Sequence, residues 1–198
     1  HRCCARSPRA WSGAEVLADR AVRAMRRVID LPDRLESLFI HLCRDGGFRL
    51  SQTKRRAHLD MLSDEQIAQV RMIQGDITDL KTVEAAVAGA GATRIIHLAA
   101  LQVPFCKADP TAGAMVNVVG TVNMFEAARR AGIDRLVYAS SVAVYGQSED
   151  YAEGPLSDDA QPNPRTHYGV YKQANEGTAR VYWLDNGISS IGLRPYTI

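Results

Sequence analysis

From about residue 70 onward, short apolar runs alternate with longer segments of helical periodicity. The expected elements, strand and helix in turn, are residues 70–74, 79–88, 94–98, 111–131, 136–140, 166–185 and 189–194. Parallel strands need a crossover connection of a dozen or more residues between them, and a helix is its usual form. The alternation therefore predicts an α/β fold with a parallel sheet and flanking helices.

Small or polar residues follow each of the four expected strands. In chain order they are Asp76, Ala99, Ala100, Ser140, Ser141 and Pro195. In open parallel sheets, ligands bind beyond the carboxyl ends of the strands. We therefore expect a ligand site along this edge of the sheet.

An acid–base pair is expected at the start of the helix at residues 166–185. Tyr168 and Lys172 are four residues apart, so a helix places them on one face. The pKa of a free phenol is about 10, which makes it a poor base at neutral pH. A neighbouring ammonium favours the phenolate and should lower that pKa. Together the two side chains suit proton exchange with a hydroxyl group.

The first sixty residues differ from the remainder in charge and pattern. They carry 13 Arg and Lys against 7 Asp and Glu, a balance of +6, whereas the remainder carries 11 against 15, a balance of −4. A capping-box sequence at residues 12–15 and apolar residues at 35, 38, 39 and 42 predict two helices here. We therefore divide the chain into an atypical basic helical segment, residues 1–60, and a second domain, residues 61–198.

Composition excludes several other classes of function. The basic residues of the first segment are interspersed with acids and have no aromatic platform, so nucleic-acid binding is not expected. The four cysteines have no metal-ligand spacing, and no metal site is expected. No apolar run reaches transmembrane length, so no membrane association is expected. With this cysteine usage, a reducing cytoplasm is the expected compartment.

Six motifs in one order are similar to those of a known family. They are Gly75 to Asp79, His97 to Ala100, Asn117 to Thr121, Ser140 to Gly146, Tyr168 to Lys172, and Leu193 to Tyr196. Residues from about 60 to 198 thereby resemble the extended short-chain dehydrogenase/reductase family, in its sugar-nucleotide epimerase/dehydratase branch. The resemblance implies a Rossmann-like domain, NAD as cofactor with NADP as the alternative, and a sugar or nucleotide-sugar substrate.

The resemblance also implies roles for individual residues. In catalysis, Tyr168 would be the acid/base, Ser141 would bond the reacting oxygen, and Lys172 would bind the nicotinamide ribose. For the cofactor, Asp76 would accept from the adenine amine and Ile77 would lie against the ring. Asn117 would brace the long helix near the site. The remaining cofactor-binding residues would be Leu98, Ala99, Ala100, Pro195 and Tyr196.

The chain departs from the family pattern at both ends. The first strands and the Gly-x-x-Gly-x-x-Gly turn that cradles the pyrophosphate at a helix N-terminus are missing. The C-terminal substrate domain is missing as well. We therefore expect an incomplete, truncated domain in which the strands at 70–74 and 94–98 lack their central neighbours, and a chain that by itself is inactive.

The reaction type is narrowed by the residues after Ser141. Dehydratases of this branch carry Asp-Glu there, whereas this chain has Val142 and Ala143, which cannot transfer protons. An epimerase and a dehydrogenase remain open. The alternative class is an inactive or dinucleotide-sensing relative. A homodimer through the helices at 111–131 and 166–185 is also expected, with Met124, Phe125, Val181 and Trp183 as its apolar surface.

Overall fold

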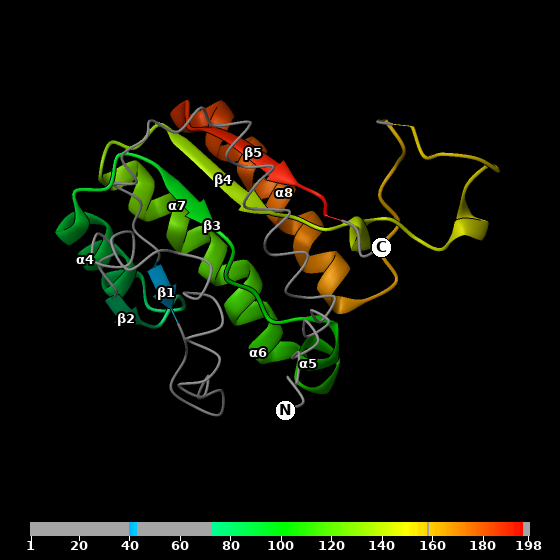
Figure 1. Cartoon of the computed structure of the whole chain (residues 1–198), viewed down its shortest axis with the longest axis horizontal. Coiled ribbons are helices and arrows are strands. Elements are labelled where there is room, and N and C mark those ends of the chain that lie inside the picture. Colours follow the sequence, from blue (N-terminus) through cyan, green and yellow to red (C-terminus); the bar gives the residue numbers. More distant parts are fainter. Residues whose placement is uncertain (1–39, 43–72, 158, 196–198) are drawn as a thin grey trace, which may run out of the picture.

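The computed structural model describes residues 40–42, 73–157 and 159–195 (Figure 1). Its elements are β1 (Ile40–Leu42), β2 (Ile73–Gly75), α4 (Leu80–Ala90), β3 (Ile95–His97), α5 (Val103–Ala108), α6 (Pro110–Ala114), the π-helical turn η1 (Met115–Val119), α7 (Gly120–Arg130), β4 (Arg135–Ala139), the 3₁₀ turns η2 (Val142–Val144) and η3 (Ser148–Asp150), α8 (His167–Asn186) and β5 (Ser189–Leu193).

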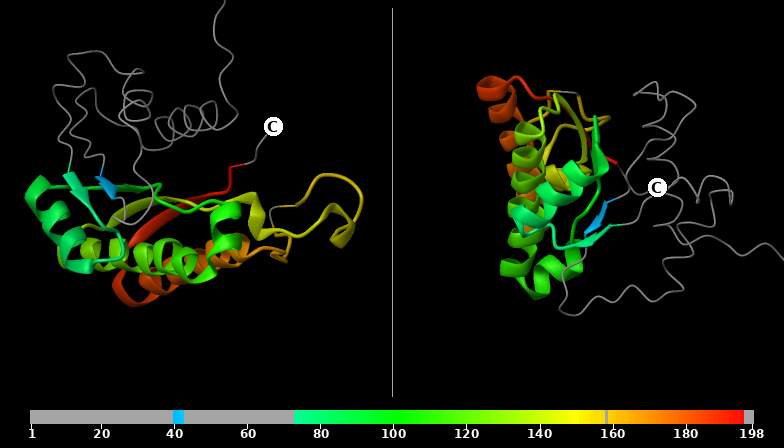
Figure 2. Two further views of the ribbon diagram at one scale, coloured as in Figure 1. Left: turned by 90° about the horizontal axis from the view of Figure 1, so that it is seen from below. Right: turned by 90° about the vertical axis from the view of Figure 1, so that its left-hand side faces the viewer.

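A parallel three-stranded sheet in the order β3-β4-β5 forms the centre of the described part. Ile96 pairs with Val137, which in turn pairs with Ile191. Helices α7 and α8 lie on one side of these strands in both views of Figure 2. The predicted α/β fold with a parallel sheet is confirmed.

Strands β1 and β2 form a separate parallel pair, with Ile40 opposite Ile73. The helix expected around residues 35–42 is therefore wrong at residues 40–42. Ile40 and Leu42 also fit the period of two of a strand, and pairing with β2 decides between the two periods. β2 thus has a neighbour where we expected none. The rest of residues 1–60 lies outside the described residues.

Helix boundaries follow from capping residues in the sequence. The Asp79 side chain accepts from the Lys81 amide at the start of α4, and Thr166 accepts from the Gly169 amide at the start of α8. Both helices end at a glycine in the left-handed region, Gly91 at φ 60° and Gly187 at φ 68°. These caps satisfy backbone groups that the helix itself leaves unpaired.

The segments between β3 and β4 are more helical than expected. Residues 103–108, which lie between two of the expected elements, form α5, since proline is tolerated in the first turn of a helix. The long helix expected at 111–131 is present as α6, η1 and α7, with a π-helical turn in its middle. That turn includes Asn117, which is buried.

Phe125 lies in the core between the helices and the sheet. Its ring stacks on Tyr182 of α8 at 4.9 Å between centroids and meets Tyr138 of β4 edge-on at 6.2 Å. Met124 and Phe125 are both buried. The expectation that these two residues form part of a dimer surface is therefore wrong, because both are already buried within the chain.

Candidate active site

Tyr168 and Lys172 are both buried, on the first two turns of α8. The Lys172 ammonium lies 5.6 Å from the centroid of the Tyr168 ring. Lys172 Nζ also donates to the carbonyl oxygen of Ala139, the last residue of β4, at 2.6 Å. The pair thus lies where β4 ends, at the sheet edge at which a ligand site was expected.

Ser141 joins this pair from the chain after β4. Its Oγ accepts from the Ala143 amide at 3.1 Å, which leaves its hydroxyl proton for another acceptor. A hydrogen bond between the Ser141 and Tyr168 side chains lowers the pKa of Tyr168. The structure therefore brings Ser141, Tyr168 and Lys172 together.

The pKa of Tyr168 differs from our expectation. Burial raises this pKa and outweighs the hydrogen bond from Ser141, so the net shift is upward. The Lys172 ammonium lies 5.6 Å from the centroid of the ring and donates to the Ala139 carbonyl. Burial in turn lowers the pKa of Lys172 to about 8. The expectation from the sequence left out the free-energy cost of removing the charged forms of both groups from water.

Gly169 lets the turn that carries Ser141 approach α8. A Cβ at this position would lie 2.1 Å from the Ala143 carbonyl oxygen and 3.0 Å from Pro164 Cβ. Backbone at that distance cannot yield as a flexible side chain can. The residue next to Tyr168 is therefore kept small so that η2 can pack against the start of α8.

Asn117 holds the segment that follows β3. Its Oδ1 accepts from the Leu101 amide at 2.7 Å, and its Nδ2 donates to the Leu101 carbonyl at 2.9 Å. This fixes the backbone next to Ala99 and Ala100, which are half-buried, while Leu98 is exposed. Asn117 is fully buried, so it holds this segment from the interior of the domain.

The residues after β2 form a tight turn. Asp76 Oδ1 accepts from both the amide and the hydroxyl of Thr78, each at 2.8 Å. The Ile77 side chain points into the core, and a Cβ on Gly120 would lie 2.9 Å from its Cγ2. An adenine ring expected against that side chain could therefore meet only the Ile77 backbone.

Pro195 follows β5 at the same edge as Ser141. Its side chain is exposed, and its carbonyl accepts from the Val142 amide at 3.4 Å. Tyr196, the other residue expected beside the cofactor at this strand end, lies outside the described residues.

A model of the NAD dependent epimerase/dehydratase family matches residues 39–198, which is most of the chain. The chain belongs to this family. The match includes the site described above together with β1, whose strand the sequence had not suggested.

Three relatives place the chain within the family. UDP-glucuronate 4-epimerase 6 of Arabidopsis thaliana is 31% identical over 147 residues, which are 73% of this chain and 31% of the relative. The structure of the Thermus thermophilus UDP-glucose 4-epimerase with NAD superposes with a TM-score of 0.61 and 30% identity, over 68% of this chain and 42% of that one. The structure of a GalE-like L-threonine dehydrogenase from Cupriavidus necator superposes with a TM-score of 0.60 and 27% identity, over 64% of this chain and 40% of that one. The chain spans less than half the length of each.

Two residues of this family member were missed as site residues. His97 lies within the buried face of β3, and its Nε2 is 3.0 Å from Thr121 Oγ1. Burial, with a smaller effect of Lys172, lowers the pKa of His97 to about 3, so it is neutral. Glu176 lies one turn beyond Lys172 and binds Ser140. The spacing of Tyr168, Lys172 and Glu176 carried a signal for Glu176, and His97 begins one of the six motifs named above.

Among residues 73–157 and 159–195, no three His, Cys, Asp or Glu side chains gather as metal ligands would. No helix in this part of the chain is long and apolar enough to cross a membrane.

Proposed function

We propose that this chain carries the proton- and hydride-transfer site of an NAD-dependent enzyme that acts on a hydroxyl of a sugar or nucleotide sugar. The observation that supports it is the convergence of Ser141, Tyr168 and Lys172 at the end of β4. The names of the Arabidopsis and Thermus relatives favour a UDP-sugar as substrate.

In this proposal Tyr168 accepts the proton of the substrate hydroxyl, and Ser141 donates to the same oxygen to hold it. The hydrogen on the carbinol carbon leaves as hydride, and NAD, when bound, supplies the acceptor. Lys172 keeps positive charge beside the phenol, which favours the phenolate in the reacting state. Burial of Tyr168 and Lys172 excludes water from the transfer and strengthens these interactions.

Parts of the site suit a dinucleotide and one part does not. Asp76 and the Ile77 backbone suit the adenine end of the dinucleotide. The hydrogen bonds from Thr78 go to Asp76 Oδ1, so Oδ2 can accept from the adenine amine. Leu98, Ala99 and Ala100 would line the middle, with Tyr168, Lys172, Pro195 and Tyr196 at the nicotinamide end. The 198 residues contain no Gly-x-x-Gly-x-x-Gly turn for the two phosphates. NADP stays open as the alternative cofactor.

Elimination of water is disfavoured by the residues next to Ser141. Val142, Ala143 and Val144 form the 3₁₀ turn η2, and Val144 is fully buried. None of these side chains can exchange a proton with a substrate. The intact Ser141, Tyr168 and Lys172 also argue against a purely cofactor-sensing role. An epimerase or a dehydrogenase therefore fits the site best.

The proposal is tested with the full-length polypeptide that carries these residues. We expect incubation with NAD and UDP-glucose to give a 4-epimer, or NADH with a keto sugar, detected by proton NMR and absorbance at the NADH band. L-Threonine serves as the comparison substrate. If L-threonine is turned over and neither UDP-glucose nor UDP-glucuronate is, the proposed substrate class is contradicted.

We also propose a homodimer in which α8 and α7 face their copies in a partner. Three apolar side chains near the end of α8 are exposed: Val181 by 53%, Trp183 by 56% and Leu184 by 67%. Exposed apolar side chains near one end of a helix are candidates for an interface. Trp183→Asp should give a monomer in sedimentation analysis, while Leu156→Asp, in an exposed loop, should not. A wild-type monomer at high concentration would contradict the dimer.

A further inference from the structure

The chain at the end of β4 is bonded to one face of α8 at three successive turns. The Ser141 hydroxyl bonds Tyr168, the Ala139 carbonyl accepts from Lys172 at 2.6 Å, and the Ser140 hydroxyl donates to Glu176 at 2.6 Å. The three helix residues are four positions apart, so they share one face. Glu176 is the third member of this series.

Glu176 also binds the residue that follows β5. Arg194 donates to its two carboxylate oxygens, from Nε at 2.7 Å and from Nη2 at 2.6 Å. Arg194 reaches further to Tyr145, whose hydroxyl it bonds and whose ring centroid lies 4.9 Å from its guanidinium carbon. A single carboxylate thus joins the ends of two neighbouring strands to the helix that carries Tyr168.

This ion pair is partly shielded from water and well matched in geometry. The side chains of Glu176 and Arg194 are 21% and 30% exposed, and the two-bond arrangement is the strongest that arginine forms with a carboxylate. Burial raises the pKa of Glu176, but the bonds from Arg194 and Ser140 outweigh it and leave the pKa below its usual value. Glu176 is therefore charged at neutral pH.

We propose that Glu176 is a positioning residue of the site, which with Ser140 and Arg194 holds Ser141 in register with Tyr168. The meaning of this role for catalysis rests on the proposed function, whereas the geometric role does not. Ser140 and Ser141 are adjacent, so a change in the bond of one displaces the other. A misplacement of about 1 Å in such a site can cost ~10²-fold in rate.

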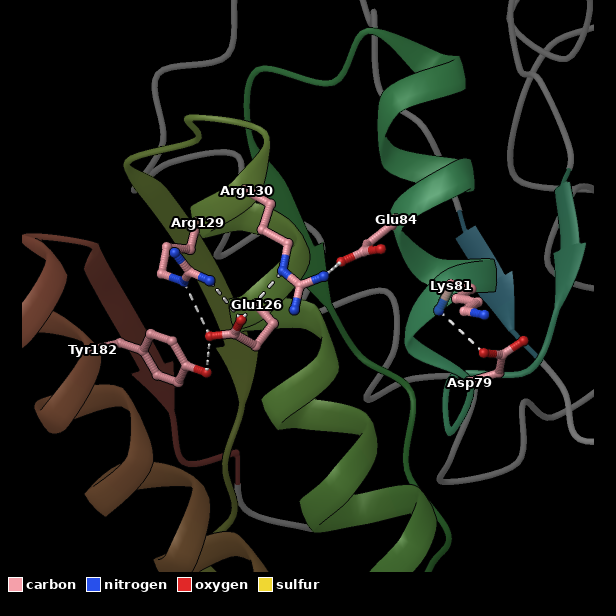
Figure 3. Close-up of polar contacts among 7 residues, drawn as sticks. All are labelled: Asp79, Lys81, Glu84, Glu126, Arg129, Arg130 and Tyr182. Atoms are coloured by element: carbon pink, nitrogen blue, oxygen red, sulfur yellow. Dashed lines mark hydrogen bonds and ion pairs between the residues drawn. The ribbon is translucent and has the colours of Figure 1, made fainter.

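Glu126 offers a matched control for a purely structural contribution. It accepts from the Tyr182 hydroxyl at 2.8 Å and from Arg129 at 2.9 Å, and it pairs with Arg130 (Figure 3). It thus also joins α8 to its neighbour α7, but it touches no residue of the site. Glu126→Gln should lower stability without changing the surroundings of Tyr168.

The test is an NMR titration of the chain labelled with ¹³Cζ-tyrosine, with the Tyr168 signal assigned from Tyr168→Phe. Glu176→Gln weakens the contact with Arg194, and Ser140→Ala removes the bond to Glu176. Both variants should shift the Tyr168 pKa upward, because the donation from Ser141 that lowers it is lost or weakened. Glu126→Gln should leave it unchanged.

An unchanged Tyr168 pKa in both variants would overturn the proposal. Failure of both variants to fold would also overturn it, because the network would then contribute to stability alone. In the full-length polypeptide, Glu176→Gln should lower kcat by about 10- to 100-fold with the substrate KM unchanged. A wild type without turnover would refute the proposed function, while the titration would still decide the role of Glu176.

Discussion

Tyr168→Phe lowers turnover of the full-length polypeptide by about 10²- to 10⁴-fold, the range that general acid–base catalysis contributes. The change removes only the hydroxyl that exchanges the substrate proton, and it keeps the ring that fills the space beside Lys172. Cofactor affinity should therefore change little. Steady-state kinetics with saturating NAD measures the effect.

Tyr171→Phe is the matched control for this substitution. Tyr171 lies on the same helix, three residues away, and its hydroxyl donates to the Pro110 carbonyl at 2.9 Å. Removing that hydroxyl costs one hydrogen bond outside the site, about 1 kcal/mol of stability, and leaves turnover near the wild-type rate. A Tyr168→Phe enzyme within threefold of wild type would remove Tyr168 from the mechanism.

The 198-residue chain by itself should bind NAD no more tightly than about 1 mM, which corresponds to ~4 kcal/mol. Asp76 and the Tyr168–Lys172 pair can hold the two ends of a dinucleotide. The pyrophosphate between them normally lies on backbone N–H groups at a helix N-terminus, which a glycine-rich turn provides. No such turn occurs in this sequence.

Isothermal titration of the chain with NAD, and with NADP in parallel, measures this affinity. We expect no heat of binding at cofactor concentrations up to the millimolar range. A micromolar dissociation constant would show that other residues of the chain build a substitute phosphate site.

Much of the fold could be predicted because the later elements are locally specified. β3, β4, β5, α4 and α8 have clear periodicity and strong capping residues, such as Thr166 before α8 and Gly187 after it. β1 was missed because its three residues fit helix and strand patterns equally, and only pairing with β2 decides. Burial of Phe125 was missed because it depends on Tyr138 and Tyr182, which are distant in sequence.

The site could be predicted in its residue types but not in its electrostatics. The spacing of Tyr168 and Lys172, together with the family resemblance around Ser141, was enough to predict that these three side chains lie in one site. The direction of the Tyr168 pKa shift could not be predicted, because it depends on the burial of the phenol in the folded chain. Glu176 was missed for a related reason: its partners Ser140 and Arg194 come from the ends of two other elements.

The central claim is hydride transfer at a sugar carbon with proton exchange at Tyr168. It is tested most directly by incubating the full-length polypeptide and NAD with UDP-glucose that carries deuterium at C4. We predict that the deuterium is kept, at C4 of the epimer or on the reduced cofactor, and that Tyr168→Phe slows the transfer by about 10²- to 10⁴-fold. Loss of the deuterium to water, or transfer at an unchanged rate in Tyr168→Phe, would contradict the account.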